Sequence, residues 1–380
     1  MKILLTGGGT GGHFYPLIAI AEEINRIADE ERIINLKLYY MSDNPYDAGL
    51  LEEQFITYIP IVSGKLRVHL SLQNILFNIK SVITVFFGII GALFKVFKLY
   101  PDVVVSKGGY ASFPVLMAAR LLRIPVIIHE SDTVPGRVSK WSGKFARKVA
   151  LSYPEAATYF ADTKVSVTGQ PIRKSYIHPV KQGAKEFFDL SPDILTVGIW
   201  GGSQGARTIN DAVVNCIGEL LDDYQVIHQT GGSDFDDVTT EVRIIMGDNT
   251  KRNRYKPFAF LNNVQSKMFA GAVDIVVSRA GSSLFEIAAW GKPSILIPYI
   301  YAHGDHQRKN AYHYARTGAC VVIEEANLTS SVLLNEIRSI LNTKERYESM
   351  SGHARAFFTP DAARKIATEA VTVAISHEKK

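Results

Sequence analysis

Two glycine-rich turns, each lying between an apolar run and a helical stretch, constrain the fold of this chain most. The first is MKILLTGGGTGGH, which ends at His13, and the second is ILTVGIWGGSQGA, which ends at Ala206. Glycine lets the backbone turn sharply after a strand and lets an anion approach the N–H groups that open the next helix. Because the turns lie about a domain length apart, they predict two similar nucleotide-type domains.

Short apolar runs alternate with helical segments throughout both halves. We expect strands at residues 2–6, 36–41, 102–106, 125–129 and 148–152, and then at 195–200, 225–229, 275–278, 294–298 and 319–323. Helices are expected at 15–27, 114–122, 206–221, 283–290 and 307–317. This alternation is typical of α/β domains with parallel sheets. The expected domains are 1–167 and 168–355, followed by a helical segment, 356–380, that packs back toward the first domain.

The charge and cysteine content exclude several classes of protein. A net charge of +5 suits contact with anionic substrates or lipids, whereas nucleic-acid binders usually carry a denser basic stripe, so no nucleic-acid partner is expected. Two cysteines, Cys216 and Cys320, are too few for a disulfide framework and are typical of a reducing cytosol. The apolar run at residues 1–6 is too short for a secretory signal. These features predict a cytoplasmic location.

Residues 70–100 are unusually apolar, with no charge between Lys80 and Lys95. The 14 uncharged residues are too few for a membrane-spanning helix, which needs about 20. Apolar residues recur in two helical stripes, so one can face the core and the other a neighbouring helix or a membrane surface. A wholly buried helix is the alternative, but the flanking lysines favour peripheral contact with an anionic membrane. The expected contact residues are Ile75, Ile79, Phe86, Ile89, Lys80 and Lys95.

The first glycine turn admits two kinds of chemistry. Gly7, Gly9 and Gly12 satisfy G-x-G-x-x-G, and Asp43 follows the second expected strand, which is the outline of a dinucleotide-binding fingerprint. An NAD-dependent dehydrogenase is therefore one reading. His13 adds a titratable group directly after the glycines, so general base catalysis is another, and a capping or packing role is the alternative for this side chain.

Eight motifs, taken together, favour one function over the others considered. In order they are GGTGGH, KGGYASFP, HES, QPIR, GGSQGA, SRAG, FEIAAWGKPSILIP and HQRKNA, beginning at Gly8 and ending at Ala311. In order and spacing the chain resembles the MurG family of bacterial glycosyltransferases, from residue 1 to about residue 370. The resemblance implies a GT-B fold, in which two Rossmann-like domains face each other across a cleft. It also implies inverting transfer of N-acetylglucosamine from UDP-N-acetylglucosamine to lipid I, giving lipid II for peptidoglycan, at the cytoplasmic face of the membrane.

The resemblance assigns the sugar nucleotide to the C-terminal half. It implies that Ser203 meets the pyrophosphate, that Arg173 contacts phosphate or uridine, and that Glu286 accepts hydrogen bonds from the ribose hydroxyls. The backbone of Leu261 would contact uracil, and Gln307 would contact hydroxyls of the transferred sugar. Taken singly, Arg173 and Glu286 could instead be surface charges and Gln307 a helix cap.

The lipid-linked acceptor is assigned to the N-terminal half. The loop that approaches the reacting sugar is matched by Thr10, Gly11, Gly12 and His13, and Tyr110 is expected to shape the acceptor pocket. An inverting transfer needs a base for the acceptor 4-hydroxyl, and His13 is the first candidate. The second candidates are Glu130 and Asp132.

Several departures from the family pattern bear on these assignments. The usual H-E-Q-N reads H-E-S-D at residues 129–132, and the segment 281–286 is one residue shorter. We expect no cofactor and no obligatory metal, because we count no Asp-x-Asp string in the chain, in particular none where a metal-dependent transferase would need one, and no histidine has zinc-site spacing. Another GT-B glycolipid transferase with a different acceptor, an NAD-dependent dehydrogenase and a non-catalytic membrane-associated nucleotide sensor remain as alternatives.

Overall fold

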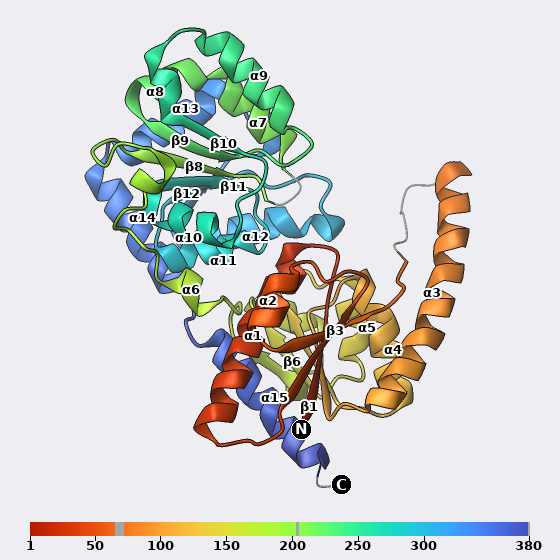
Figure 1. Cartoon of the computed structure of the whole chain (residues 1–380). Helices are drawn as coiled ribbons and strands as arrows, with labels where there is room; N and C mark the ends of the chain where they lie inside the picture. Colours follow the sequence, from red (N-terminus) through yellow and green to blue (C-terminus); the bar gives the residue numbers. More distant parts are fainter. Residues whose placement is uncertain (65–71, 203–204, 379–380) are drawn as a thin grey trace. The chain divides into compact units, whose positions relative to one another are not determined.

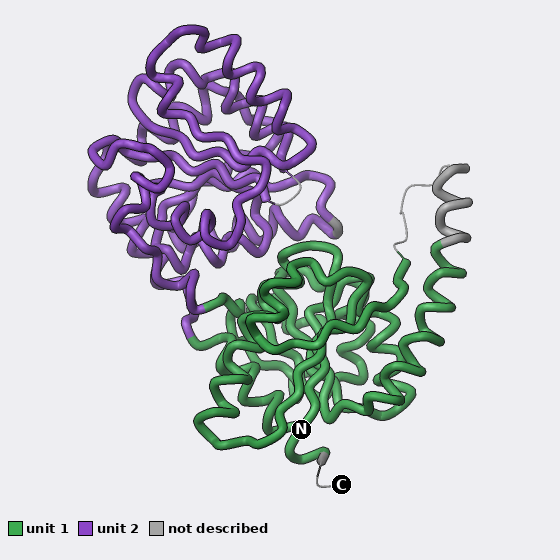
Figure 2. Tube along the Cα trace, viewed as in Figure 1, with its two compact units in different colours: residues 1–173, 361–380 green, residues 174–360 purple. Residues whose placement is uncertain are grey.

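The computed structural model describes residues 1–64, 72–202 and 205–378, without the side chains of 72–80, 303 and 378. The chain forms two compact units, coloured separately in Figure 2. Unit 1 comprises Met1–Arg173 with Asp361–Lys380, and unit 2 comprises Lys174–Pro360. The sequence had placed these boundaries at residues 167 and 355. Each unit is built on one parallel sheet, which confirms the expected fold class.

The sheet of unit 1 has seven parallel strands in the order β3-β2-β1-β4-β5-β6-β7. The strands are β1 (Lys2–Thr6), β2 (Lys37–Ser42), β3 (Ile56–Pro60), β4 (Val103–Ser106), β5 (Val126–Glu130), β6 (Lys148–Leu151) and β7 (Val165–Val167). The chain runs outward from β1 through β2 and β3, and then returns to β4 on the other side of β1. In such sheets ligands bind beyond the carboxyl ends of the strands at this change of direction.

Helices cover both faces of this sheet (Figure 1). They are α1 (Gly11–Glu30), α2 (Ala48–Glu53), α3 (Leu72–Leu99), α4 (Phe113–Leu121), α5 (Arg137–Gly143) and α15 (Ala362–Glu378). Side chains alternate along a strand, so Ile3 and Leu5 pack with the α1 and α15 side, while Leu4 packs with the α3 and α4 side. Residues more than 300 positions apart thereby complete one core, because α15 lies along α1.

Helix α3 buries one face and exposes another. Ala92 and Val96 are fully buried against the α4 side of the sheet, and a Cβ at Gly88 would lie 2.2 Å from the carbonyl oxygen of Val62. The exposed face instead carries Phe94 and Phe97, which are 69% and 64% exposed. With Ile83 and Ile90 these rings form the second apolar stripe, whereas the stripe expected to contact the membrane contains both the exposed Phe86 and the buried Val96.

The expected membrane-contact residues thus divide into different environments. Phe86 is exposed, Ile89 is half-buried, and Lys95 is half-buried and donates a hydrogen bond to the carbonyl of Pro60. The side chains of Ile75, Ile79 and Lys80 lie outside the described part of the structure. The expectation that this segment is too short to span is wrong on length, since Ser81–Leu99 has the length and hydropathy to cross a membrane.

The sheet of unit 2 has six parallel strands in the order β10-β9-β8-β11-β12-β13. They are β8 (Thr196–Trp200), β9 (Gln225–Gln229), β10 (Tyr255–Phe258), β11 (Ile275–Ser278), β12 (Ser294–Leu296) and β13 (Cys320–Val322). The helices are α6 (Lys174–Ile177), α7 (Arg207–Asn215), α8 (Ile217–Asp223), α9 (Phe235–Met246), α10 (Asn263–Ala272), α11 (Ser283–Trp290), α12 (His306–Ala315), α13 (Ser330–Leu341) and α14 (Lys344–Phe357). Here the change of direction falls between β8 and β11, so this unit repeats the plan of unit 1.

Candidate active site

Four loops of unit 1 meet beyond the carboxyl edge of its sheet, because β2, β1, β4 and β5 are neighbours in that order. The loop after β1 is so close to the next two that a Cβ at Gly8 would lie 2.5 Å from Ser42 Oγ and 2.7 Å from Ala111. A Cβ at Gly109 would lie 3.2 Å from Nδ1 of His13. Glycine at these positions therefore allows the loops that carry His13 and Tyr110 to touch.

His13 lies in the first turn of α1, directly after the glycine-rich loop. Its Nδ1 is 2.9 Å from the carbonyl oxygen of Gly8 and 3.4 Å from Oγ1 of Thr10. A carbonyl oxygen can only accept, so Nδ1 carries the proton and Nε2 carries the lone pair. This is the tautomer that a general base acting through Nε2 requires.

Glu130 ends β5 and is buried. Its Oε1 accepts hydrogen bonds from the amides of Ser131 (2.9 Å) and Asp132 (3.1 Å), and its Oε2 accepts from the amide of Gly136 (3.2 Å). Burial raises the pKa of Glu130, as does the Asp132 carboxylate, while Lys107 opposes the shift. Both oxygens hold the following loop, so Glu130 is better suited to shape that loop than to exchange protons with a substrate.

Lys107 is a residue whose role the sequence analysis missed, although it belongs to the quoted KGGY motif. Its side chain is buried, and its ammonium group contacts Oγ of Ser131. Burial lowers the pKa of Lys107, and the carboxylates of Glu130 and Asp132 oppose this. The two residues that depart from the family's H-E-Q-N pattern thus lie beside a buried cation. A carboxylate at position 132 is electrostatically matched to it.

Tyr110 lies over the glycine loop, since a Cβ at Gly9 would be 2.7 Å from Cε1 of its ring. Gly9 has a φ of 94°, a conformation that other residues rarely adopt. Burial raises the pKa of Tyr110, and the nearby Asp43 carboxylate raises it further. Asp43 also accepts a hydrogen bond from Ser63 Oγ (2.8 Å). The phenol of Tyr110 therefore stays protonated and can donate.

Arg173 lies in unit 1, whereas the sequence analysis placed it in the second domain. It is buried, and the centre of its guanidinium is 4.5 Å from the ring centre of Tyr15 on α1, a cation–π contact. The preceding residues are fixed as well, because the carbonyl of Gly169 lies 3.0 Å from Nε2 of His129. Arg173 is thus held by the unit that carries His13.

In unit 2, Gln229 at the end of β9 joins two candidate donor-binding segments. Its Nε2 donates to the carbonyl of Gly202 (2.8 Å), and its Oε1 accepts from the amide of Leu261 (3.0 Å). The carbonyl of Leu261 accepts from Ser266 Oγ (3.1 Å). Both backbone groups of the expected uracil-contact residue therefore have partners within the unit. Ser203 lies outside the described residues.

Glu286 and Gln307 lie near the carboxyl edge of the same sheet. Glu286 is half-buried in the first turn of α11, which follows β11. Gln307 is in the first turn of α12, and its Oε1 accepts from the amide of Tyr299 (3.0 Å). This contact leaves the amide nitrogen of Gln307 as its donor toward a ligand.

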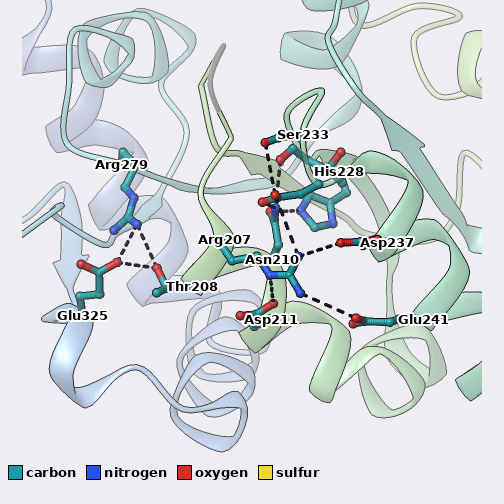
Figure 3. A network of polar contacts seen from close by, with 12 residues as sticks. Arg207, Thr208, Asn210, Asp211, His228, Ser233, Asp237, Glu241, Arg279 and Glu325 are labelled. Atoms are coloured by element: carbon teal, nitrogen blue, oxygen red, sulfur yellow. Dashed lines mark hydrogen bonds and ion pairs between the residues drawn. The ribbon is translucent and has the colours of Figure 1, made fainter. Parts of the chain in front are cut away.

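Arg279, in the SRAG motif, fixes the turn that leads to Glu286 (Figure 3). Its guanidinium donates to Glu325 Oε1 (2.7 Å), to Thr208 Oγ1 (2.9 Å) and to the carbonyl of Ile297 (3.1 Å). Glu325 and Arg279 are both largely buried, so the pair is little screened. The network ties the segments after β8, β11 and β12 together, and sequence reasoning did not identify it.

A second network links α7 to β9 and β10, and Asn210 and His228 are its central residues (Figure 3). Buried His228 lies between Oδ1 of Asn210 and the hydroxyl of Tyr255, each 2.9 Å from a ring nitrogen. Asn210 donates to the carbonyl of Thr230 (2.9 Å) and to Asp234 Oδ2 (3.0 Å). Burial lowers the pKa of His228 to about 3, so this histidine is neutral at physiological pH.

The chain does contain an Asp-x-Asp string, at residues 234–236, which the sequence analysis overlooked. Asp234 precedes α9 and takes part in the Asn210 contact, so its role is structural. Within residues 1–64, 72–202 and 205–378, no group of three or more His, Cys, Asp or Glu side chains is arranged to hold a metal ion.

Family models match both units. The glycosyltransferase family 28 N-terminal domain matches residues 3–151, and the family 28 C-terminal domain matches residues 196–366. The chain belongs to glycosyltransferase family 28. A family 28 relative from Thermodesulfovibrio yellowstonii is 38% identical over 376 residues, which cover 96% of this chain and 97% of the relative. That relative is named UDP-N-acetylglucosamine--N-acetylmuramyl-(pentapeptide) pyrophosphoryl-undecaprenol N-acetylglucosamine transferase.

Solved structures place this family 28 chain in the GT-B fold. MurG of Acinetobacter baumannii is 21% identical and superposes with a TM-score of 0.68, with 98% of this chain and 99% of that chain covered. A UDP-GlcNAc 2-epimerase from Neisseria meningitidis, solved with UDP-GlcNAc, is 14% identical with a TM-score of 0.69, with 98% and 100% covered. The fold is thus shared by transferases and epimerases, and the fold alone does not choose between them.

Proposed function

We propose that this chain transfers N-acetylglucosamine from UDP-N-acetylglucosamine to the 4-hydroxyl of the N-acetylmuramoyl unit of lipid I, giving lipid II for peptidoglycan synthesis. One observation carries the proposal. The relative named for this transfer is 38% identical over nearly the whole length of both chains. The epimerase likeness, at 14% identity, supports only the fold.

The donor is proposed to bind at the carboxyl edge of the unit 2 sheet. Glu286 would accept hydrogen bonds from the ribose hydroxyls, and Gln307 would donate from its amide nitrogen to a hydroxyl of the sugar. Ser203 and Arg173 are proposed for the diphosphate, and the Leu261 segment for the uracil. The Gln229 bridge between Gly202 and Leu261 supports this grouping, because it fixes two of these segments relative to each other.

His13 is proposed as the general base that accepts the proton of the acceptor 4-hydroxyl. Its Nδ1 faces the Gly8 carbonyl, so Nε2 is the nitrogen that can accept the proton of the attacking 4-hydroxyl. The oxygen then attacks the anomeric carbon from the face opposite UDP. UDP leaves with the bonding electrons, and the configuration of the anomeric carbon is inverted. The glycine-loop amides of Gly11 and Gly12, with Thr10, are proposed to contact anionic groups of the substrates at the start of α1. Tyr110 would line the acceptor pocket.

Peripheral attachment to the anionic cytoplasmic face of the membrane is proposed to occur through the exposed side of α3. The acceptor is anchored in the bilayer by its polyprenyl chain, so unit 1 must reach the headgroup layer. Ile90, Phe94 and Phe97 recur at helical spacing and are all at least half exposed. Burial of Ala92 and Val96 against unit 1 favours lateral contact over a span, because a spanning helix would have to leave this packing.

The decisive experiment supplies the purified protein with radiolabelled UDP-N-acetylglucosamine, with and without lipid I. We expect label in lipid II only when lipid I is present. Conversion of the donor alone to a 2-epimer would contradict the proposal and favour an epimerase, and label in a different lipid would favour another glycolipid transferase.

Glu286→Ala should weaken UDP binding by about 1–3 kcal/mol in calorimetry. If the wild-type protein binds NAD but not UDP, the result would support the alternative hypothesis of an NAD-dependent dehydrogenase.

A further inference from the structure

A separate cavity of unit 2 opens at the amino edge of its sheet. It has a volume of about 190 Å³ and lies where the α11–β12 connection meets α14 and the segment after α6. Because the sheet is parallel and Lys292 precedes β12, this edge is opposite the one that carries Glu286 and Gln307. Its lining includes three basic side chains, Lys181, Lys292 and Arg355.

Lys292 is the central observation. It is 7% exposed and lines the cavity; its amide donates to the carbonyl of Ile287 (3.3 Å), but no hydrogen bond or ion pair joins its side chain to another described residue. Burial lowers the pKa of Lys292 to about 8; Lys181, Lys185 and Arg355 lower it too, against the opposing effect of Asp274. Asp274 is itself engaged by Lys185 (3.3 Å) and by the amide of Thr196 (2.8 Å). Asp274 therefore balances the charge of the largely buried Lys292 side chain only in part, and a poorly balanced buried charge is costly.

The backbone brings the other cation to the cavity. Gly291 ends α11 with a φ of 63°, and a Cβ there would lie 2.6 Å from Cγ and 2.8 Å from Nη1 of Arg355. Ser351, one turn earlier on α14, donates from Oγ to the Gly291 carbonyl (2.6 Å). The absence of a side chain at Gly291 thus lets Arg355 lie across the connection beside Lys292.

The charge of the lining is unbalanced. Besides the three cations, the lining contains the acid Glu348, whose side chain is 64% exposed and lies 3.9 Å from Lys344 Nζ. Tyr347 also lines the cavity, and burial raises its pKa to about 12, so it contributes no negative charge near neutral pH. Lys181 and Arg355 are exposed at their ends, which leaves the cavity open to a small solute.

We propose that this cavity, the Lys292 pocket, binds a small oxyanion of the phosphate class, inorganic phosphate or pyrophosphate. Three converging cations attract a multivalent anion, and the planar guanidinium of Arg355 can donate to two of its oxygens. The bound anion adds negative charge beside Lys292, whose charge Asp274 balances only in part. A volume of about 190 Å³ falls below the 300–1,000 Å³ typical of pockets for larger organic ligands, which favours a small anion over an intact nucleotide.

The test titrates the whole protein with pyrophosphate or phosphate in separate arms, each with saturating UDP so that a diphosphate site for the donor is occupied. Calorimetry gives the stoichiometry, and Trp290 in the lining provides a fluorescence signal. We expect one saturable site, weakened at least tenfold by Lys292→Met and by Arg355→Gln. Lys251→Met removes a half-exposed lysine of the same unit that pairs with Asp222 and does not line the cavity, and it should leave the affinity unchanged.

The pH dependence gives a second readout. Sulfate keeps its charge between pH 7 and 9.5, so its binding to the wild type should weaken over this range as Lys292 loses its proton, and the Lys292→Met variant should lack this change. The charged groups around Lys292, which are Asp274, Lys181, Lys185, Glu348 and Arg355, are the same in both proteins. Equal anion affinity in wild type and Lys292→Met, or no binding to the wild type, would overturn the proposal. If Lys292→Met fails to fold, the test uses Arg355→Gln, which changes an exposed residue. An anion affinity of Arg355→Gln equal to that of the wild type would also overturn the proposal.

Discussion

A histidine can act as a base only through the nitrogen that keeps its lone pair, and the Gly8 carbonyl determines that nitrogen for His13. We therefore expect His13→Ala to lower kcat by about 10²–10⁴-fold while changing UDP affinity little, since the base acts mainly in the transition state. Steady-state kinetics and calorimetry on the same preparation measure both effects.

The competing carboxylates provide the controls for this prediction. Glu130→Gln keeps one acceptor oxygen but replaces the other, so it should disturb the 131–136 loop and affect stability together with activity. Asp132→Asn should leave more activity than His13→Ala. If Asp132→Asn abolishes turnover while His13→Ala retains most of it, Asp132 is the base.

Acid sensitivity of unit 2 should follow from His228. Its folded pKa is about 3, whereas in the unfolded chain it is about 6.5, so below pH 6.5 the unfolded state binds more protons and stability falls as pH falls. The loss amounts to about 2 kcal/mol at pH 5 relative to pH 7. Urea unfolding, followed by Trp200 and Trp290 in a Trp141→Phe background, should show it. His228→Gln should flatten the profile, and an unchanged slope would assign the loss to other groups.

Among the elements, α3 shows why a stripe on a helix does not by itself identify the exposed face. Two apolar stripes were visible in the sequence, but only packing against α4 and the carbonyl of Val62 decides which one is buried. We predict that Phe94→Ser with Phe97→Ser reduces co-sedimentation with anionic liposomes, and activity on long-chain lipid I, without loss of folding.

The control for α3 is Phe55→Ser, which removes a still more exposed aromatic ring of unit 1 from the turn before β3. It should leave liposome binding unchanged. Activity of the double variant on a short-chain soluble acceptor should persist, because only the membrane contact is removed. Retained liposome binding in the double variant would place the membrane contact on another surface.

The strands that sequence patterning missed share one property. β3, β7 and β10 all lie at sheet edges, whereas the interior strands were predicted to within a residue or two at most ends. The apolar runs of these missed strands are short or interrupted, by Pro60 in β3 and by Pro257 in β10, whereas the fourth edge strand, β13, is wholly apolar and was predicted. The helix expected at 206–221 divides at Cys216, two residues before Gly218, into α7 and α8.

The site residues that the sequence predicted are those whose positions depend on neighbouring residues in the chain. The position of His13 depends on a few preceding residues, so the local glycine motif was enough to single it out. Lys107, Gln229 and Arg279 act through partners 24, 32 and 46 residues away, and no short motif contains both members of such a pair. The binding and catalytic roles of the motif residues remain predictions.

For the molecule as a whole, unit 1 depends on a helix that follows unit 2 in the chain. Burial of Ile366, Val371 and Val373 of α15 contributes about 5–9 kcal/mol at the usual value per side chain, comparable with the stability of a whole domain. We predict that deleting residues 361–380 unfolds unit 1 and spares unit 2.

Limited proteolysis with mass spectrometry distinguishes the two units in that experiment. Peptides from 1–173 should be released quickly and those from 174–360 slowly, whereas deletion of 379–380 alone should change neither rate. Equal protection of both units after the longer deletion would show that α15 is dispensable for unit 1.

Because unit 1 is built from two separate parts of the chain, the ribosome makes these parts at different times. The first 173 residues are synthesised before unit 2, yet α15 is synthesised only after the whole of unit 2. At about 5–20 residues per second, the roughly 330 residues between α1 and α15 take roughly 17–66 s to synthesise, and the apolar side of α1 lacks its partner helix for that time. During that interval the nascent chain presents an uncovered hydrophobic surface, and chaperones that recognise such surfaces have a defined time in which to act on it.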